Sequence, residues 1–341
     1  MAERRKLTAT LVLLLILAAV PAQAADLGAR AMGMGGAYVA LANDASAVYW
    51  NPAGLSEVSW VSLTPVVAIE TSGVKSLQSF MEAVDPERGS LPTENFSLTA
   101  SGSGLAGIVT KRFGVSYLPS ARVTAEYTYN ESSTSAKMTA RATVYNDTVL
   151  SAAVPLARAP FNLAAVSVGG NFKFIQGKYY YSSDATIEES TPPELTATGN
   201  GWALDLGAQA KVSERLRLGV AARDLVRNVS WSGTSTPAEA NRPTLAAGAA
   251  FKAPLGFTIA ADVENTREDG RDFTRLRAGF EQSLFGLVAL RGGVRTNPDN
   301  QKPTFSLGFG AGLFKFLRLE LAVASDLQDR LEGCLTGILQ F

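Results

Sequence analysis

From about residue 58 to the last residue, large apolar side chains alternate with small or charged ones at a period of two residues. In 316–325, a large apolar residue occupies every second position from Leu317 to Val323, and arginine, glutamate or alanine fills the positions between. This spacing fits an extended strand and no helical period. Comparable segments separated by turn residues recur along the chain. The sequence therefore predicts an all-β fold.

Two kinds of β fold share this alternation. In a soluble sandwich the large apolar face looks inward, whereas in a membrane barrel it meets lipid and the charged or small face lines the lumen. The connections favour the barrel, because tight turns such as 212–215 and 283–286 alternate with longer polar stretches near 71–102, 182–196 and 230–242. Short turns on one side and long loops on the other are typical of outer-membrane barrels.

Aromatic residues also differ between the two ends of these strands. Phe285 and Phe314 lie at tight turns, whereas Tyr127, Tyr179 and Trp231 lie near the long loops. This distribution predicts two aromatic girdles at the membrane interfaces. The chain ends on Phe341, which closes the apolar face of the last alternating strand and is interpreted as the terminal signal of an outer-membrane barrel.

The alternation and the turn signals together predict about fourteen strands. They lie near 59–70, 103–111, 113–129, 138–153, 162–180, 198–211, 215–229, 243–252, 256–265, 273–282, 286–295, 303–313, 316–325 and 331–341. A strand needs roughly 9 to 11 residues to cross a membrane, so those at 113–129 and 162–180 are expected to project beyond it. We expect a transmembrane antiparallel β-barrel over 58–341 in the bacterial outer membrane, with a β-sandwich as the alternative.

The first 24 residues have the three parts of a secretory signal peptide. A basic stretch, Arg4 to Lys6, precedes an apolar run and the small-residue cleavage site Ala22-Gln-Ala24. The full chain has 31 basic and 31 acidic residues; removing three basic residues and Glu3 leaves a formal charge of −2. Such a balance gives no basic surface for nucleic acid. We therefore expect an exported protein that does not bind nucleic acid.

Residue types needed for most catalysis are scarce. Histidine is absent, which removes the commonest general base and the commonest metal ligand. Cys334 is the single cysteine, so an internal disulfide is excluded. The sequence predicts no enzyme, no catalytic residue, no cofactor and no metal site.

A segment rich in glycine and alanine, 25–57, follows the signal peptide. Its glycines allow the backbone to turn freely and to approach a barrel wall closely. Tyr38 stands where a dinucleotide loop would have its third glycine, so such a loop is excluded. Asn43 and Asp44 are expected to cap a short helix, and Asn51 with Pro52 to form a turn. The motif residues of this segment are Gly33, Gly35, Gly36, Asn43, Asp44, Asn51, Pro52 and Gly54.

This segment strongly resembles the opening of PorV/PorQ-type proteins in the FadL superfamily. The resemblance is carried by Gly28-Ala-Arg-Ala-Met-Gly-Met-Gly-Gly-Ala37, Asn43-Asp-Ala45 and Tyr49-Trp-Asn-Pro-Ala-Gly-Leu55. It implies a fourteen-stranded barrel whose amino-terminal segment folds into the lumen as a plug. Such a plug either only seals the lumen or also moves and lines a substrate path. Superfamily relatives carry fatty acids or aromatic hydrocarbons, whereas the PorV-like branch serves protein secretion and surface attachment.

Charged residues fall on the face of the later strands that a barrel turns toward its lumen. They form a candidate polar wall: Asp262, Glu264, Arg275, Arg277, Glu281, Arg291, Arg295, Arg318 and Glu320. Buried charges need partners, so ion pairs that hold plug and wall together are one explanation. Selection of an anionic head group by Arg275, Arg291 and Arg295 is the other.

Two functions remain open from the sequence. The first is transport of hydrophobic small molecules across the outer membrane, with a hydrophobic ligand in the lumen and lipid outside. The second is a scaffold or shuttle for protein secretion and attachment, in which the long loops near 71–102, 182–196 and 230–242 hold an exported partner.

Overall fold

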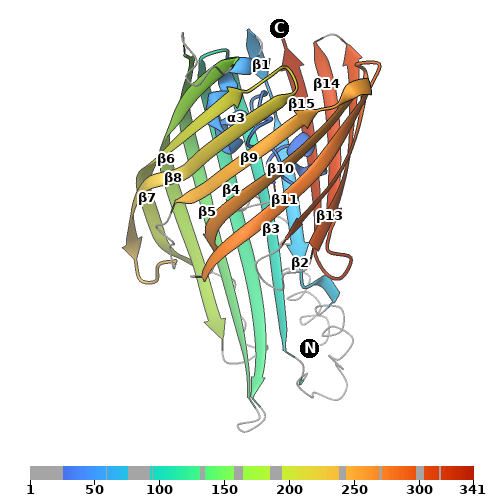
Figure 1. Cartoon of the computed structure of the whole chain (residues 1–341). Coiled ribbons are helices and arrows are strands. Elements are labelled where there is room, and N and C mark those ends of the chain that lie inside the picture. The colour runs from blue at the N-terminus through green and yellow to red at the C-terminus, as the bar shows by residue number, and fades with distance from the viewer. Residues whose placement is uncertain are drawn as a thin grey trace.

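The chain forms a closed antiparallel barrel with further chain inside it (Figure 1). The computed structural model describes residues 26–58, 60–75, 93, 95–130, 135–156, 164–184, 194–237, 243–268, 271–296, 303–314 and 316–341. The predicted signal peptide, 1–24, lies outside the described residues, as do large parts of the three predicted long loops.

Fifteen strands form one continuous sheet within the described residues. They are β1 (Val61–Leu63), β2 (Val66–Ser72), β3 (Phe96–Thr110), β4 (Phe113–Asn130), β5 (Ser135–Pro155), β6 (Ala165–Asp184), β7 (Glu194–Lys211), β8 (Leu216–Gly233), β9 (Thr244–Lys252), β10 (Phe257–Glu268), β11 (Arg271–Leu284), β12 (Val288–Thr296), β13 (Pro303–Phe314), β14 (Leu317–Ser325) and β15 (Leu331–Gln340). The short helices are α2 (Ala29–Gly33), α3 (Ala47–Trp50), η1 (Pro52–Glu57) and η4 (Pro254–Gly256).

The predicted strand 59–70 is interrupted in its middle. Both β1 and β2 pair with β3 on one side and β15 on the other, so they are two pieces of one strand position. Thr64 and Pro65 lie between them, and proline has no N–H to donate to a ladder. Counting the two pieces as one gives a closed fourteen-stranded barrel, which confirms the predicted fold class.

The pleat of the sheet separates the two kinds of side chain. Large apolar residues point outward; Leu307 and Leu331, for example, are 67% and 60% exposed. The alternate residues point into the lumen, and charged ones among them, such as Glu264 and Arg291, are buried. An apolar outer surface around a polar interior is the arrangement of a membrane barrel rather than of a soluble sandwich.

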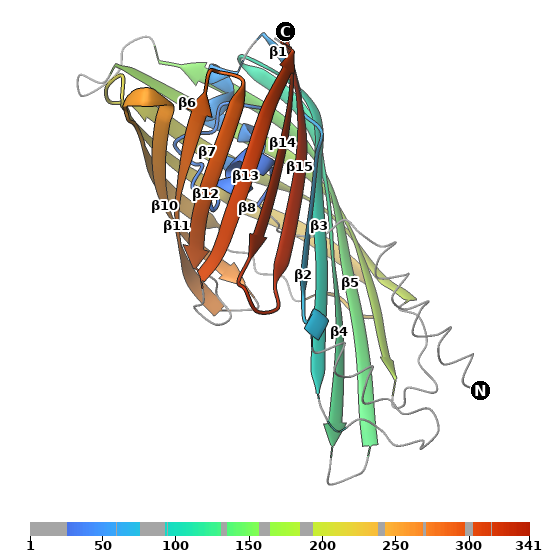
Figure 2. The same ribbon diagram turned by 90° about the vertical axis from the view of Figure 1, so that its right-hand side faces the viewer.

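The strands differ greatly in length around the barrel. Strands β4 to β8 have 18 to 21 residues, whereas β9, β12 and β14 have nine. Nine residues are enough to cross a membrane, and the longer strands exceed that need. Figure 2 shows β3, β4 and β5 extending far past β13 to β15 at the end opposite the C-terminus. The long strands predicted at 113–129 and 162–180 are present as β4 and β6, and β5 is equally long. We call β4 to β8 the long wall.

One of the two predicted aromatic girdles is wrong. At the tight-turn end, Phe285 and Phe314 are exposed as expected. Near the long loops, Tyr179 is buried and Trp231 packs against Gly177 and Gly199 on the inner face of the barrel. The positions of Tyr179 and Trp231 in the pleat, rather than their nearness to a loop, decide which face they occupy.

Phe341 completes the edge of the barrel at the tight-turn end. Its N–H donates to the carbonyl of Val61, and its carbonyl accepts from Val61 in return (3.0 and 3.3 Å). The exposed ring stacks on Phe316, with centroids 6.3 Å apart, and Phe316 stacks on Phe314 at 5.5 Å. The terminal aromatic side chain therefore belongs to an outward-facing row at the membrane interface.

We expect Phe341→Ala to lower the amount of folded barrel in the outer membrane several-fold. The change removes both the end of the aromatic row and the terminal signal that we predict from the sequence. Folded barrel is measured by the mobility shift between unheated and boiled membrane samples on a denaturing gel. Phe341→Tyr keeps the ring and is the matched control; equal losses in both variants would contradict the predicted role.

Candidate functional site in the barrel lumen

Residues Asp26–Val58, which we call the inner segment, lie inside the barrel (Figures 1 and 2). Three short helices, α2, α3 and η1, are joined by turns, and almost every residue of the segment is buried. The fully buried side chains of Met32, Tyr38, Trp50 and Leu55 belong to the main hydrophobic cluster of the structure. Among the described residues, no helix is both long and apolar enough to cross a membrane.

Glycines bring the inner segment into backbone contact with the wall. Gly35 and Gly36 have positive φ, at 65° and 78°, a region that L side chains rarely adopt. Opposite them, a Cβ on Gly293 of β12 would lie 2.1 Å from the amide nitrogen of Gly35, and one on Gly279 of β11 would lie 2.2 Å from the carbonyl oxygen of Met34. Gly33 meets Gly308 of β13 in the same way. This turn fits the wall because both surfaces are bare backbone.

Asn51 connects the inner segment to the long wall. Its side-chain amide donates to the carbonyls of Val39, Ala208 and Val220 at 3.0 to 3.2 Å. Its side-chain oxygen accepts from the N–H of Ala53, and Pro52 begins η1 directly after it. Gly54 lies so close to Ala42 that a Cβ would come within 2.1 Å of the carbonyl oxygen.

The predicted capping by Asn43 and Asp44 is only partly right. The α3 helix exists, but its N-cap residue is Ser46. Asp44 accepts from the Ser46 N–H at 2.8 Å and from the Tyr38 hydroxyl at 2.7 Å. Asn43 does not cap a helix; its side-chain oxygen accepts from Arg30 at 2.9 Å. The two residues therefore fix the interior of the segment more than the helix end.

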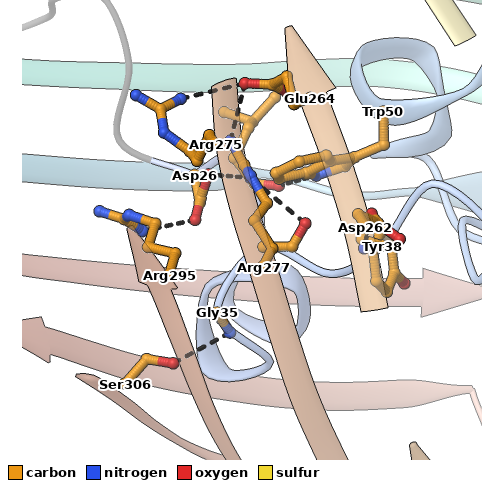
Figure 3. A network of polar contacts seen from close by, with 12 residues as sticks. Asp26, Gly35, Tyr38, Trp50, Asp262, Glu264, Arg275, Arg277, Arg295 and Ser306 are labelled. Atoms are coloured by element: carbon orange, nitrogen blue, oxygen red, sulfur yellow. Dashed lines mark hydrogen bonds and ion pairs between the residues drawn. The ribbon is translucent and has the colours of Figure 1, made fainter. Parts of the chain in front are cut away.

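Asp26 anchors the start of the inner segment to the charged wall (Figure 3). Its two carboxylate oxygens accept from Arg277 of β11 at 2.7 Å and from Arg295 of β12 at 2.6 Å. Burial by itself would raise the pKa of Asp26, but the two guanidinium groups hold it well below its ordinary value. Arg295 also pairs with Glu332 of β15. The carboxylate is thus ionised and shared between two strands.

Asp262 of β10 holds the next part of the segment, and Glu264 of the same strand binds arginines of the wall (Figure 3). One oxygen of Asp262 accepts from the N–H groups of Tyr38 and Val39, at 2.7 and 2.8 Å. Glu264 pairs with three arginines from two strands, the predicted Arg275 and Arg277 of β11 at 3.1 Å and the unpredicted Arg223 of β8. The wall charges at this point therefore bind one another as well as the inner segment.

A third group of charges binds α2. Arg30 donates to both oxygens of Glu281 at 2.8 Å. Arg291 bridges Glu281 and Glu320, at 2.7 and 3.0 Å, and Arg318 pairs with Glu320 at 2.9 Å. All nine wall charges predicted from the sequence thus face the lumen and have charged partners or backbone donors. Arg275, Arg291 and Arg295 each hold a carboxylate of this chain, which favours the ion-pair explanation over selection of an anionic head group.

Several members of the lumen network are missing from the sequence-based set. Asp26, Arg30, Arg223 and Glu332 complete the ion pairs described above. On the long wall, Lys173 pairs with Asp205 and Asp224, at 2.9 and 2.8 Å. The wall members could have been found by extending the same alternation to β6, β7, β8 and β15, whereas nothing local distinguishes Asp26 or Arg30.

Glu57 closes the contact between η1 and the wall at the tight-turn end. It pairs with Lys211 at 2.7 Å and with Arg217 at 3.2 Å. Burial would raise the pKa of Glu57, but the hydrogen bond from Lys211 and the charge of Arg217 hold it below its ordinary value. A crevice beside this pair is lined by Ala40, Glu57, Ala165, Ser167, Gln209, Ala210, Lys211 and Arg217.

Solved structures with this fold are known, although sequence comparison finds no relative. No family model matches the sequence, and no curated protein sequence matches it. The toluene transporter TodX of Pseudomonas putida matches 92% of this chain and 98% of its own, with a TM-score of 0.61 and 11% identity. The toluene transporter TbuX of Ralstonia pickettii gives 0.62 at 11% identity over 92% and 98%, and a Pseudomonas aeruginosa FadL homologue gives 0.52 at 12% over 92% and 98%.

These matches show a shared fold over nearly the whole chain. It is the fold of FadL-type outer-membrane barrels of bacteria, with an outward apolar surface suited to lipid. The more specific resemblance to PorV/PorQ-type proteins rests on the motifs of the inner segment and stays a prediction.

Proposed function

We propose that this protein lets hydrophobic small molecules cross the outer membrane, and that the inner segment is the plug of the barrel. The observation that carries the proposal is the fold shared with two toluene transporters over 92% of the chain. The filled lumen supports it, because buried side chains and ion pairs of the inner segment occupy the space that a porin leaves to water. We place the plug at 25–57 and the barrel at 58–341.

A break in the wall offers a way out for an apolar molecule beside such a plug. The β3–β4 ladder is paired at Ser103–Ser120 and again at Ala106–Tyr117, with no pairing between these points. Pro119 lies in this gap and cannot donate. On the other side of β3, Thr64 and Pro65 interrupt the neighbouring strand at nearly the same height. Strand β3 thus lacks ladder pairs to β4 at Gly104 and Leu105, and to β1 and β2 at the next two residues, which favours a local opening there over one in an unbroken ladder.

A disulfide across this gap tests whether it is part of the path. The register puts Leu105 directly opposite Leu118. In a Cys334→Ser background, the pair Leu105→Cys and Leu118→Cys should lower uptake of a labelled hydrocarbon or fatty acid when oxidised, with recovery on reduction, because the bond staples β3 to β4. Ala322→Cys with the native Cys334 staples an intact ladder and is the control. Full uptake by the oxidised Leu105/Leu118 variant would show that the transported molecule does not leave through the gap between β3 and β4.

The alternative function is a scaffold that holds an exported protein at the long loops. The molecules that purify together with the barrel distinguish this function from transport. We expect mass spectrometry of the gently solubilised protein to find a bound apolar small molecule, and affinity capture to find no stoichiometric protein. An exported protein held in equal amount by an empty barrel would refute the transport proposal and favour the scaffold.

A further inference from the structure

The outward face of the long wall changes from apolar to polar partway along its strands. On β6, the exposed ring of Phe174 is followed on the same face by Gln176 and Lys178, which are also exposed. The shorter strands β9 and β15 show no such change, because Leu245 and Leu331 are exposed apolar residues at their loop ends. The apolar outer surface therefore ends inside β6 but runs to the loop ends of β9 and β15.

Aromatic side chains gather where the apolar surface of the long wall ends. Phe174 pairs in register with Trp202 of β7, and both are exposed. Phe172 stacks on Trp202, with centroids 6.0 Å apart, and meets Phe174 edge to face at 4.8 Å. Tyr117 of β4 is also exposed, and its hydroxyl donates to the side-chain oxygen of Asn146. We call Tyr117, Phe172, Phe174 and Trp202 the aromatic row.

Three amide side chains follow directly on the side of the long loops. Asn146 of β5 pairs in register with Gln176 of β6, and Gln176 pairs with Asn200 of β7. These three strands are neighbours in the long wall (Figure 1). Each side-chain amide has two N–H donors and one carbonyl acceptor. We call these three residues the amide row; it lies on the outer surface of the barrel, where Gln176 and Asn200 are exposed.

The amide row fits within one layer of the membrane. Barrel strands tilt by about 35 to 45° and lie about 4.8 Å apart, so neighbouring members of the row differ in height by roughly 3 Å. The three amides therefore cover about 6 Å, which matches a head-group layer of about 5 to 7 Å. Aromatic side chains are enriched where hydrocarbon meets head groups, and the aromatic row lies directly below. This order puts the amide row at the level of the head groups.

A positive charge lies just beyond the amide row. Lys178 follows Gln176 by two residues on the same face of β6 and is exposed. Its cross-strand neighbours in register are Val144 of β5 and Thr198 of β7, neither of which carries a charge. Among the residues that the structure describes, Lys178 has no ion-pair partner. Its ammonium group is thus available to an anion at the membrane surface.

We propose that the aromatic row, the amide row and Lys178 bind the phosphorylated sugar head group of a glycolipid in the outer leaflet. The amides exchange hydrogen bonds with sugar hydroxyls, and Lys178 pairs with a phosphate. The acyl chains continue onto the apolar outer surface below the aromatic row. From Asn146 to Asn200 the row spans two strand spacings, roughly 10 Å, which suits a disaccharide better than a single phosphate. This surface lies outside the lumen, so it binds glycolipid whether or not the barrel transports small molecules.

Native mass spectrometry of the purified barrel in detergent tests the surface with two added lipids. One is lipid A, an acylated and phosphorylated glucosamine disaccharide, and the other is phosphatidylglycerol, which has a phosphate but no sugar ring. We expect the native protein to bind lipid A about tenfold more tightly than phosphatidylglycerol. The double variant Gln176→Leu with Asn200→Leu should lose this preference. The matched control, Gln176→Asn with Asn200→Gln, retains both amides and should keep it.

The contribution of the charge is tested in the same way. Lys178→Ala should weaken binding of both lipids several-fold, whereas Lys111→Ala, which removes an exposed lysine from a tight turn at the other end, should change neither. Each lipid preference is a ratio measured within one variant, so a partial loss of folded protein does not alter it. Equal binding of the two lipids by the native protein, or an undiminished preference in the double leucine variant, would overturn the proposal.

The level of the membrane surface on the long wall can be measured separately. In a Cys334→Ser background, a nitroxide spin label is attached at Phe174→Cys or at Lys178→Cys, and the barrel is placed in lipid vesicles. We expect the label at 174 to be more accessible to oxygen, which concentrates in hydrocarbon, and the label at 178 to be more accessible to a water-soluble nickel chelate. A label at 178 that favours oxygen would place Lys178 in the hydrocarbon and contradict the proposed head-group contact.

Discussion

Replacing Gly293 by valine is expected to displace the inner segment and open the barrel to water and ions. The new Cβ would lie 2.1 Å from the amide nitrogen of Gly35 and 2.3 Å from the carbonyl carbon of Met34. These are backbone atoms, which cannot move aside as a flexible side chain can. In planar lipid bilayers, we expect the native protein to show no steady conductance and Gly293→Val to show large, steady openings.

Two further variants make this result decisive. Gly279→Val removes space on the neighbouring strand, where a Cβ would lie 2.2 Å from the Met34 carbonyl oxygen, and should behave like Gly293→Val. Gly312→Val adds the same side chain to β13, where the nearest atom is 3.6 Å away, and should stay closed. Folded barrel is confirmed by the heat-dependent gel shift before conductance is recorded. A closed Gly293→Val barrel that has folded would show that the inner segment does not seal the lumen.

The second large effect is expected at Asp26. In Asp26→Leu, Arg277 and Arg295 lose the carboxylate that they share, and removing one partner of a buried ion pair destabilises a protein by about 3 to 5 kcal/mol. We expect a loss of this order in the free energy of unfolding of the reconstituted barrel, measured by urea titration in lipid vesicles. Glu57→Gln breaks a more exposed pair and should cost about 1 kcal/mol or less. Equal effects in the two variants would contradict the anchoring role of Asp26.

The ion pairs of Asp26 also determine how the free energy of unfolding depends on pH. Because the pKa of Asp26 is lower in the folded protein than in the unfolded chain, its contribution is complete above the ordinary value of about 3.9. The contribution is lost only as pH falls from there toward the lowered value. The native barrel should therefore lose more stability than Asp26→Leu when the urea titration is repeated at increasingly acidic pH.

The wall could be predicted from the sequence because successive residues of a strand point to opposite faces of the sheet, so each face is visible as every second residue. Alternation alone placed Asp262, Arg277 and Glu320 in the lumen, since a one-residue error would have put their charges in lipid. It also gave the number of strands. The interruption of the first strand was missed although Pro65 lies inside 59–70, where a proline argues against an unbroken ladder.

The contacts of the inner segment could not be predicted in the same way. Asp26 and Arg277 are 251 residues apart, and no pattern in a single sequence joins positions so distant. The glycines of the segment indicate close approach to a wall, but not that Gly279 and Gly293 receive it. Trp231 was assigned to a girdle because it lies near a loop, although it shares the lumen-facing register of Arg227. In strands that project beyond the membrane, nearness to a loop no longer indicates a lipid contact.

We expect the barrel to pass apolar molecules while the inner segment keeps water-soluble ones out. Two fluxes measured in the same culture of Gram-negative host cells that lack such a transporter test this selectivity. One is uptake of a labelled hydrocarbon or fatty acid, and the other is hydrolysis of a hydrophilic chromogenic β-lactam by a periplasmic β-lactamase. We predict that the native protein raises the first several-fold and leaves the second unchanged. Unchanged hydrocarbon uptake, or a matching rise in β-lactam hydrolysis, would show that the barrel is not a selective path for apolar molecules.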